Sequence, residues 1–388
     1  MIGSFKFKSL ILFILFLLGG CRSSLPESLS KIELRDEIHS QRIPLVFVPG
    51  IKGSVLKDQK NATMWLTAFQ ALGLSTPDLS LKKSSNPFFP VGAIERVTLI
   101  PYIVDVALYG PWLERMTLEE DFDFYVFSYD WRKDNINSRD ALKIFLEKIS
   151  KAYKHKPVLV GHSMGGMLSF SVINSDPDLV DKVVLVGVPF RGGIGYMKDL
   201  YSGNSTGFNS KIQAPCTIVR YESVYSFFPR LNTKDSQGLV LDDKGKPIPI
   251  DFFAESSWRD NKLGFYGNHC QEDDTPSQLE FQNILNRAKL FRESLDLKST
   301  LLNKSPQALV VNANNRQTRK FIQHKDGMNL PSWEIDNTTK SDGDGSVLFE
   351  HSLPPEGFKY KMIQTEYEHS LMLNDKSVQN QILNFLRN

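Results

Sequence analysis

The sequence has little cysteine, no excess of charge of either sign and no internal repeat. Its 388 residues include 3 cysteines, and 46 basic residues stand against 44 acidic ones, for a formal net charge of +2. Such a balance provides no broad basic surface of the kind that binds nucleic acid, so we expect no nucleic-acid partner. Hydrophobic residues make up 41% of the chain. That share is sufficient for a large core and excludes global disorder.

No apolar run at the N-terminus is long enough for a stable transmembrane helix. The run from Leu10 to Leu18 is about half of the ~20 residues that such a helix needs. Lys6 and Lys8 precede it, and the small residues Gly19 and Gly20 follow it. A short basic segment, a short apolar core and small residues are typical of a signal peptide. We therefore expect residues 1–20 to be a signal peptide.

The tetrad Leu18-Gly19-Gly20-Cys21 resembles a bacterial lipobox, a signal whose cysteine is lipidated and becomes the mature N-terminus. The alternative is an ordinary signal peptide followed by an incidental cysteine. Residues 22–40 are polar and mixed in charge, as in a tether, and would reach roughly 60 Å when fully extended. We predict a lipidated N-terminus and tether over residues 21–40. The protein would then be exported and anchored to a bacterial membrane as a lipoprotein, facing the periplasm or the cell surface.

Cys216 and Cys270 are the remaining cysteines. In an oxidising compartment a pair of this kind could form a disulfide. The alternative is two unpaired, partly buried thiols. Because spacing along the sequence says nothing about the distance between the two sulfur atoms, both alternatives stay open at this point.

Short apolar runs alternate with helical patterns over much of the chain. Continuous apolar runs predict strands buried on both faces, and three- and four-residue spacing predicts helices. The order strand, helix, strand favours a parallel sheet with right-handed crossovers. The predicted strands are 44–49, 122–129, 157–160, 183–188, 308–312 and 360–364; the predicted helices are one that opens at Ser138, Met164 to Ser175, and one that ends near Leu386.

The alternation stops near Gly195. From there to about Ser305 the sequence is irregular and rich in aromatic residues, and residues 239–250 have the pattern of a hairpin. We interpret residues 195–305 as a cap inserted into a sheet domain that spans residues 41–388. The Asn- and Lys-rich stretches between residues 312 and 360 are predicted to be loops.

The segment Gly161-His162-Ser163-Met164-Gly165 lies between a predicted strand and a predicted helix. A serine hydroxyl is a weak nucleophile that needs a base for its proton and donors for the oxyanion that forms. Glycines beside the serine let the strand turn sharply into the helix and expose the hydroxyl. We therefore predict that Ser163 is the nucleophile of an α/β-hydrolase fold, a mostly parallel sheet flanked by helices. An inert serine in a structural turn is the alternative.

In that fold an acid and then a histidine follow the nucleophile along the chain. His369 comes just after the last predicted strand, where the base is expected, whereas His162 is interpreted as pointing elsewhere. Asp344, in a tight Gly-Asp turn, is the preferred acid, and Asp342 is the alternative. This turn lacks the glycine and the glutamate that a calcium loop needs at its later positions, so we expect no metal and no cofactor.

An oxyanion hole requires two backbone N–H groups. One is expected from Met164, the residue after the nucleophile. The other is expected from the loop after the first strand, where the Ile51 amide is the candidate. Gly50 and Gly53 in this loop allow the close backbone approach that the oxyanion demands.

Several segments, in order, resemble the lecithin:cholesterol acyltransferase family, which includes lysosomal phospholipase/acyltransferases. The resemblance spans about residues 44–386. It implies a Ser163–Asp344–His369 triad and an oxyanion hole from the Ile51 and Met164 amides. The cap is only loosely similar, and the cysteines do not reproduce the disulfides of the animal members. The matching segments are Val48 to Leu56, a stretch around Trp65, Tyr129-Asp130-Trp131-Arg132, Gly161 to Gly166, Pro189 to Gly193, Asp342 to Val347, and His369 with Met372.

By that resemblance the protein is expected to act on acyl esters of lipids, such as phospholipids, through an acyl-enzyme. The acyl group would pass to water or to an alcohol. The expected partners are this lipid substrate and the membrane surface reached through the N-terminal anchor; the oligomeric state is not indicated. Two alternatives stay open. One is a carboxylesterase or amidase for small non-lipid substrates, and the other is a non-catalytic lipoprotein that binds a surface partner.

Overall fold

The computed structural model describes residues 41–82, 86–100, 104–267, 270–271, 275–325, 333–335 and 340–388. The expected signal peptide and the expected tether with Cys21 lie outside these described residues. Within them, no helix combines the length and the apolar character that crossing a membrane requires.

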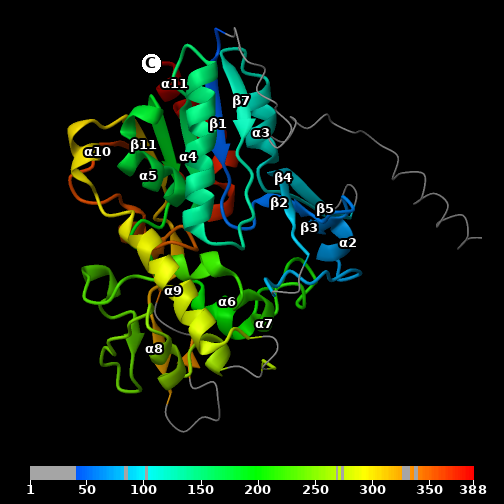
Figure 1. Cartoon of the computed structure of the whole chain (residues 1–388), viewed down its shortest axis with the longest axis vertical. Helices are drawn as coiled ribbons and strands as arrows, with labels where there is room; N and C mark the ends of the chain where they lie inside the picture. Colours follow the sequence, from blue (N-terminus) through cyan, green and yellow to red (C-terminus); the bar gives the residue numbers. More distant parts are fainter. Residues whose placement is uncertain are drawn as a thin grey trace, which may run out of the picture.

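A six-stranded parallel sheet forms the centre of the molecule (Figure 1). All of its neighbouring strands run parallel, which confirms the predicted α/β class. In spatial order the strands are β16 (Lys361–Gln364), β11 (Gln307–Asn312), β9 (Lys182–Val186), β8 (Val158–His162), β1 (Ile43–Val48) and β7 (Phe122–Val126).

The central strands are continuous apolar runs because both faces of the sheet are covered. Strands β8 and β9 are buried at every position. Along β1, Val46 and Val48 join one hydrophobic core, while Leu45 and Phe47 join another on the opposite face. The first core is closed by α4 (Asn135–Ala152) and α5 (Met164–Ser175), and the second by α3 (Gly110–Thr117) and α11 (Lys376–Arg387).

Two predicted boundaries in the first half of the chain were wrong. Helix α4 begins at Asn135 rather than Ser138, because the Asp134 carboxylate caps it by accepting the Ile136 N–H (2.8 Å). Strand β7 ends at Val126 rather than Tyr129, and the Tyr129 amide instead donates to Ser54 Oγ (3.3 Å). The residues after β7 therefore leave the sheet to support the loop that follows β1.

The segment after β9 packs beyond one end of the sheet (Figure 1). Its helices are α6 (Met197–Ser202), α7 (Pro215–Ile218), α8 (Glu255–Asp260) and α9 (Gln278–Glu293). The expected hairpin is present in short form: Leu241 forms an antiparallel bridge with Pro247, and the Ile248 amide donates to the Val240 carbonyl (2.8 Å). Its first strand, β10 (Val240–Leu241), pairs in parallel with β13 (Ile322–His324). We call residues 195–295 the cap; α10 (Ser299–Asn303) already packs on α5 through the Thr300 hydroxyl and the Asn174 carbonyl (2.8 Å).

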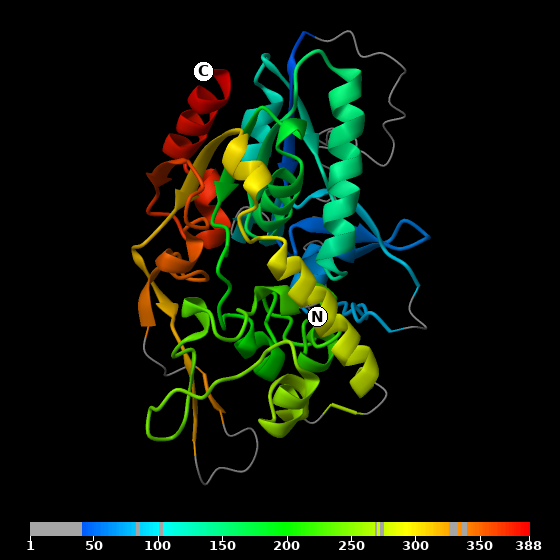
Figure 2. The same cartoon turned by 60° about the vertical axis from the view of Figure 1, so that its left-hand side comes forward.

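The prediction of loops between β11 and β16 was wrong in part: Asn314 and Asn315 do lie in a loop, but four short strands occur farther along. Strands β12 (Arg316–Arg319) and β15 (Lys340–Gly343) form an antiparallel pair, while β13 pairs with β10 and with β14 (Trp333–Glu334). This second excursion runs alongside the cap (Figure 2). Such short strands leave no periodic signal, because their stability depends on partners far away in the sequence.

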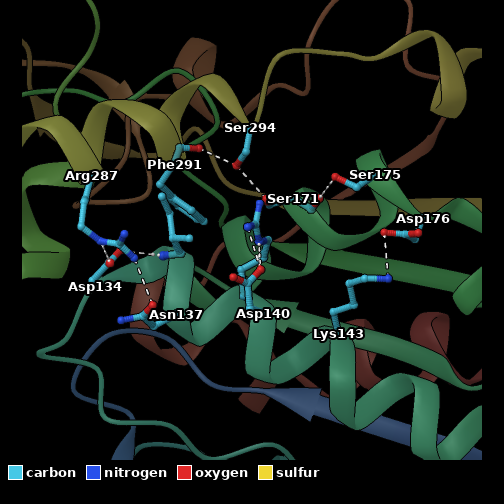
Figure 3. Close-up of polar contacts among 12 residues, drawn as sticks. Asp134, Asn137, Asp140, Lys143, Ser171, Ser175, Asp176, Arg287, Phe291 and Ser294 are labelled. Carbon is cyan, nitrogen blue, oxygen red and sulfur yellow. Dashed lines mark hydrogen bonds and ion pairs between the residues drawn. The ribbon is translucent and has the colours of Figure 1, made fainter.

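Helix α9 is fixed to the sheet domain by polar contacts (Figure 3). Arg287 forms an ion pair with Asp134, and its Nη2 donates to Asn137 Oδ1 (3.0 Å). Near the other end of α9, the hydroxyls of Ser171 and Ser294 are hydrogen-bonded (2.7 Å). These contacts join the cap to α4 and to α5, the helix that follows Ser163.

Cys216, in α7, and Cys270 form a disulfide, one of the two alternatives that the sequence left open. Their Cα atoms are 5.5 Å apart, and their sequence separation is 54 residues. A cross-link of this span within the cap stabilises the fold by about 4 kcal/mol, chiefly by restricting the unfolded chain.

Candidate active site

Ser163 occupies the turn between β8 and α5. Its backbone has φ 53° and ψ −121°, a conformation that costs a side-chain-bearing residue about 1–3 kcal/mol. Close packing also demands the flanking glycines. A Cβ on Gly165 would lie 2.2 Å from the Val48 carbonyl oxygen, and one on Gly161 would lie 2.6 Å from Ser169 Oγ. The strained turn presents the Ser163 hydroxyl at the carboxyl end of the central strand.

The structure brings Ser163, His369 and Asp344 into one hydrogen-bonded chain. His369 Nε2 lies 2.8 Å from Ser163 Oγ, and His369 Nδ1 lies 2.8 Å from Asp344 Oδ2. Asp344 is buried, and its Oδ1 accepts the amides of Ser346 (2.9 Å) and Val347 (2.7 Å). With Asp344 accepting the proton on Nδ1, Nε2 is left with a lone pair facing the Ser163 hydroxyl.

His369 and Asp344 shift each other's pKa. Burial alone would lower the pKa of His369, but the charge and hydrogen bond of Asp344 raise it above its ordinary value. Burial alone would raise the pKa of Asp344, yet His369 and two backbone N–H groups hold it below its ordinary value. Near neutral pH, Asp344 is therefore ionised and His369 can exchange a proton in either direction.

Asp342, the alternative acid, lies apart from this chain. It is exposed on β15, and among the described residues its Oδ1 accepts a single, long hydrogen bond from Gln317 Nε2 (3.5 Å). Residues two apart in a strand face the same way, so it is the turn beyond β15, which ends at Gly343, that aims Asp344 toward His369. Geometry thus favours Asp344 over Asp342.

The two candidate oxyanion donors lie beside Ser163. A Cβ on Gly50 would lie 3.0 Å from Ser163 Cβ, so the loop after β1 packs directly against the serine. Across the described part of the chain, neither the Ile51 nor the Met164 amide donates a hydrogen bond. Both N–H groups are thus available to an oxygen that binds next to Ser163 Oγ.

Four aromatic side chains hold the loop that carries Ile51. Hydrogen bonds with the backbone of residues 49, 50, 52 and 54 fix the path of this loop. The Ile51 amide is thereby oriented before any substrate binds. These contacts give Trp65 and the Tyr129-Asp130-Trp131-Arg132 motif a shared structural role. The four bonds run from Tyr129 Oη to the Pro49 carbonyl (2.9 Å), from Trp65 Nε1 to the Lys52 carbonyl (2.8 Å), from Trp131 Nε1 to the Ser54 carbonyl (3.2 Å), and from the Gly50 amide to Tyr109 Oη (3.0 Å).

The interpretation that His162 points away from the site was wrong. Its Nε2 lies 2.9 Å from the His369 carbonyl oxygen, and its Nδ1 lies 2.7 Å from Tyr109 Oη. Burial, together with the nearby His369, lowers the pKa of His162 to about 3, so the ring is neutral. Because a carbonyl only accepts, Nε2 carries the proton and Nδ1 accepts from Tyr109, which itself accepts from Gly50.

His162 and Tyr109 therefore connect the main chain of His369 to the loop that carries Ile51. Sequence reasoning missed both. Tyr109 lies in no motif, and its hydroxyl reaches His162 from a position 53 residues earlier in the chain. The one feature of the sequence that could have indicated this contact is the histidine directly before Ser163. A titratable side chain at that buried position needs hydrogen-bond partners.

A cavity of about 380 Å³ opens beside Ser163 and His369. This volume is within the range of small-molecule sites. In the described residues no group of three or more His, Cys, Asp or Glu side chains is arranged to hold a metal ion. The apolar residues in its lining are Ile51, Leu108, Ile194, Phe227, Val347 and Leu348, and the charged ones are Lys52, Asp199, Arg319 and Lys340.

Comparisons with known proteins agree with this architecture. The model of the family described as lecithin:cholesterol acyltransferase matches residues 107–303, just over half of the chain. An uncharacterized protein of Saccharomyces cerevisiae is 24% identical over 295 residues, covering 72% of this chain and 42% of the yeast protein. The chain thus spans less than half of that relative's length.

Similar solved structures include a chain of the Tle4–Tli4 complex, with a TM-score of 0.54, 14% identity, and coverage of 89% of this chain and 98% of that one. A second is the mature lipase BlEst2 of Bacillus licheniformis, with a TM-score of 0.40, 13% identity, and coverage of 89% and 92%. At such low identity the first likeness bears on the fold alone. With the strand order, it confirms the α/β-hydrolase fold.

Proposed function

Because this chain belongs to the lecithin:cholesterol acyltransferase family, we propose that it is a serine-dependent enzyme that hydrolyses or transfers acyl groups of lipid esters. The family and the fold support an α/β-hydrolase of the acyl hydrolase and acyltransferase class. Our proposal adds to this class a serine nucleophile and a lipid substrate. The observation that carries the proposal is the pair of hydrogen bonds that link Asp344 to His369 and His369 to Ser163, beside two available backbone amides.

In the proposed reaction His369 Nε2 takes the hydroxyl proton while Ser163 Oγ attacks the ester carbonyl carbon. The Ile51 and Met164 amides donate to the oxygen that becomes negative. Asp344 stabilises the imidazolium, which then gives its proton to the departing alcohol. The acyl-enzyme is released when water or a second alcohol attacks it and returns its proton through His369.

Two features support a lipid substrate at a membrane surface. The apolar side chains in the lining of the cavity suit an acyl chain. Phe69, Leu74 and Phe208 are 59%, 70% and 75% exposed and lie on adjoining segments, since the Phe208 amide donates to the Ala71 carbonyl beside them (2.8 Å). Grouped exposed apolar side chains favour contact with another surface. We propose that they meet the membrane to which Cys21 anchors the chain.

Product analysis tests the function directly. The purified protein is incubated with mixed phospholipid vesicles, with and without a long-chain alcohol, and Ser163→Ala serves as the background control. Free fatty acid alone identifies a hydrolase, and a new ester identifies a transferase. Neither product, together with fast cleavage of short acyl esters in a chain-length series, would favour the small-molecule esterase. A well-folded protein inactive on the whole panel would favour the non-catalytic lipoprotein.

The pH profile is expected to follow His369. Only neutral His369 can accept the Ser163 proton, so kcat/KM should fall as pH drops through its pKa. Because Asp344 raises that pKa above the ordinary 6.5, the acidic limb should lie above pH 6.5. Hydrolysis of an uncharged soluble ester between pH 5 and 9 measures the limb. A midpoint well below 6.5 would contradict the raised pKa.

Tyr109→Phe is expected to lower kcat by roughly tenfold and to change KM little, because losing one buried hydrogen-bond partner removes about 1–2 kcal/mol. The phenyl ring still fills the core, but His162 Nδ1 and the Gly50 amide lose the hydroxyl that joins them. The loop that presents Ile51 should then fit the transition state less well.

Tyr225→Phe is the matched control for this change. Its hydroxyl is equally buried but bonds the Val219 carbonyl (2.7 Å) inside the cap. Both variants should lose similar thermal stability. If Tyr109→Phe and Tyr225→Phe have the same kcat, Tyr109 does not position the loop that presents Ile51.

A further inference from the structure

The Ile51 amide lies in a tight turn with a strained backbone. The Gly53 amide donates to the Gly50 carbonyl (3.0 Å), so Ile51 and Lys52 are the two central residues of this turn. Lys52 has φ 63°, in the left-handed region. That conformation is unfavourable for a residue with a side chain, and it persists only where the surrounding structure imposes it. The turn that presents the Ile51 amide therefore depends on contacts that hold Lys52.

Lys52 is held from two sides. Its carbonyl accepts from Trp65 Nε1 (2.8 Å), which belongs to the sheet domain. Its side chain reaches the cap, where Nζ donates to Asp199 Oδ2 (3.3 Å) on α6. Nζ also lies 5.6 Å from the centre of the Tyr196 ring, within the distance of a cation–π contact. The Lys52 side chain thus connects the turn beside Ser163 to the cap.

The ion pair between Lys52 and Asp199 is largely sheltered from water. The two side chains are 17% and 15% exposed, so the solvent screens their attraction little. At the cap end, Asp199 Oδ2 also accepts from Asn204 Nδ2 (3.0 Å). The Tyr196 ring stacks on Phe227, with ring centres 4.6 Å apart. Because contacts within the cap fix Asp199 and Tyr196, they can restrain Lys52.

We infer that the ion pair between Lys52 and Asp199 positions the Ile51 amide for the oxyanion, and so makes catalysis depend on a docked cap. The inference rests on the proposed function and concerns the same site. Lys52 acts through the backbone of the residue before it, so it is a positioning residue and not a catalytic one. Because a hydrogen-bond donor must be oriented before the reaction to stabilise the transition state, loss of the pair lowers kcat.

The test measures kcat and KM for an uncharged soluble ester, which does not respond to the charge of the cavity. Lys52→Met keeps the length of the side chain and removes its ammonium, and Asp199→Asn removes the carboxylate. Each is expected to lower kcat about tenfold and to change KM by less than about twofold. The double variant should lose no more than either single variant, because the two residues act through one interaction. Lys52→Arg keeps the charge and should retain kcat within about threefold.

Arg287→Met is the matched control. It breaks another ion pair between the cap and the sheet domain, the one with Asp134, and Arg287 does not line the cavity beside Ser163. This variant should keep kcat. The melting temperature of each variant shows whether it is folded. If Lys52→Met does not fold, Asp199→Asn decides the question from a separate element.

Several results would overturn the inference. Single variants that keep kcat, or that change only KM, show that the pair does not position the donor. Losses that multiply in the double variant show two independent effects. An equal loss of kcat in Arg287→Met shows a general need for an attached cap and no particular role of Lys52. An unaltered protein no more active than Ser163→Ala on any ester overturns the proposed function itself, on which the inference rests.

Discussion

Ser163→Ala is expected to reduce turnover of acyl esters by about 10⁴-fold or more. The change removes the oxygen that we propose attacks the ester, while the cavity, the Ile51 amide and the Met164 amide stay in place. Alanine meets the same strained backbone at φ 53° as serine does, so the fold should be retained. Because the groups that bind the substrate remain, KM should change far less than kcat.

A fluorophosphonate that reacts with activated serines provides a second measurement of the same prediction. The unaltered protein should take up one equivalent at Ser163, and Ser163→Ala should take up none. Ser169→Ala is the matched control on the same helix, since the Ser169 hydroxyl is buried and donates to the Gly165 carbonyl (2.7 Å). It should keep both labelling and turnover. Full activity and undiminished labelling of Ser163→Ala would refute the assignment of the nucleophile.

The parts of this site that could be predicted are those fixed by local chemistry. Helix α5 begins at Met164 and ends at Ser175, as expected, because the glycines of the turn and the apolar pattern after it are local in sequence. His369 was predicted from its place after the last strand, and Asp344 from chain order, its tight turn and the family resemblance, with Asp342 as the alternative. Parallel strands collect their carboxyl ends at one edge, so residues that follow late strands meet the one that follows β8.

The parts that could not be predicted depend on contacts between distant segments. Nothing near Tyr109 signals that its hydroxyl bonds His162, because that contact exists only once α3 packs against the sheet. The ion pair between Lys52 and Asp199 was missed for a related reason. The two residues are 147 positions apart in the sequence, and only the packing of the cap brings them together. Distant pairing of this kind carries no local periodic signal.

Asp344→Asn is expected to lower kcat by about 10³- to 10⁴-fold with little change in the fold. The asparagine amide can donate to His369 Nδ1, which favours the tautomer with its proton on Nε2. That nitrogen then faces Ser163 Oγ as a donor and cannot take the hydroxyl proton. Loss of the carboxylate also removes the main influence that raises the pKa of His369, so the acidic limb of the pH profile should move to lower pH.

Asp342→Asn is the control that decides between the two carboxylates of the turn. Asp342 is exposed, and its contact within the described chain is the long one with Gln317 (3.5 Å). Its replacement should therefore leave kcat within about twofold of the unaltered protein and the pH limb in place. Measuring both variants over pH 5 to 9 separates a catalytic effect from a general one, because destabilising the turn would lower activity without moving the limb. A larger loss in Asp342→Asn than in Asp344→Asn would transfer the role of the acid to Asp342. It would also require the turn that now presents Asp344 to His369 to rearrange when substrate binds.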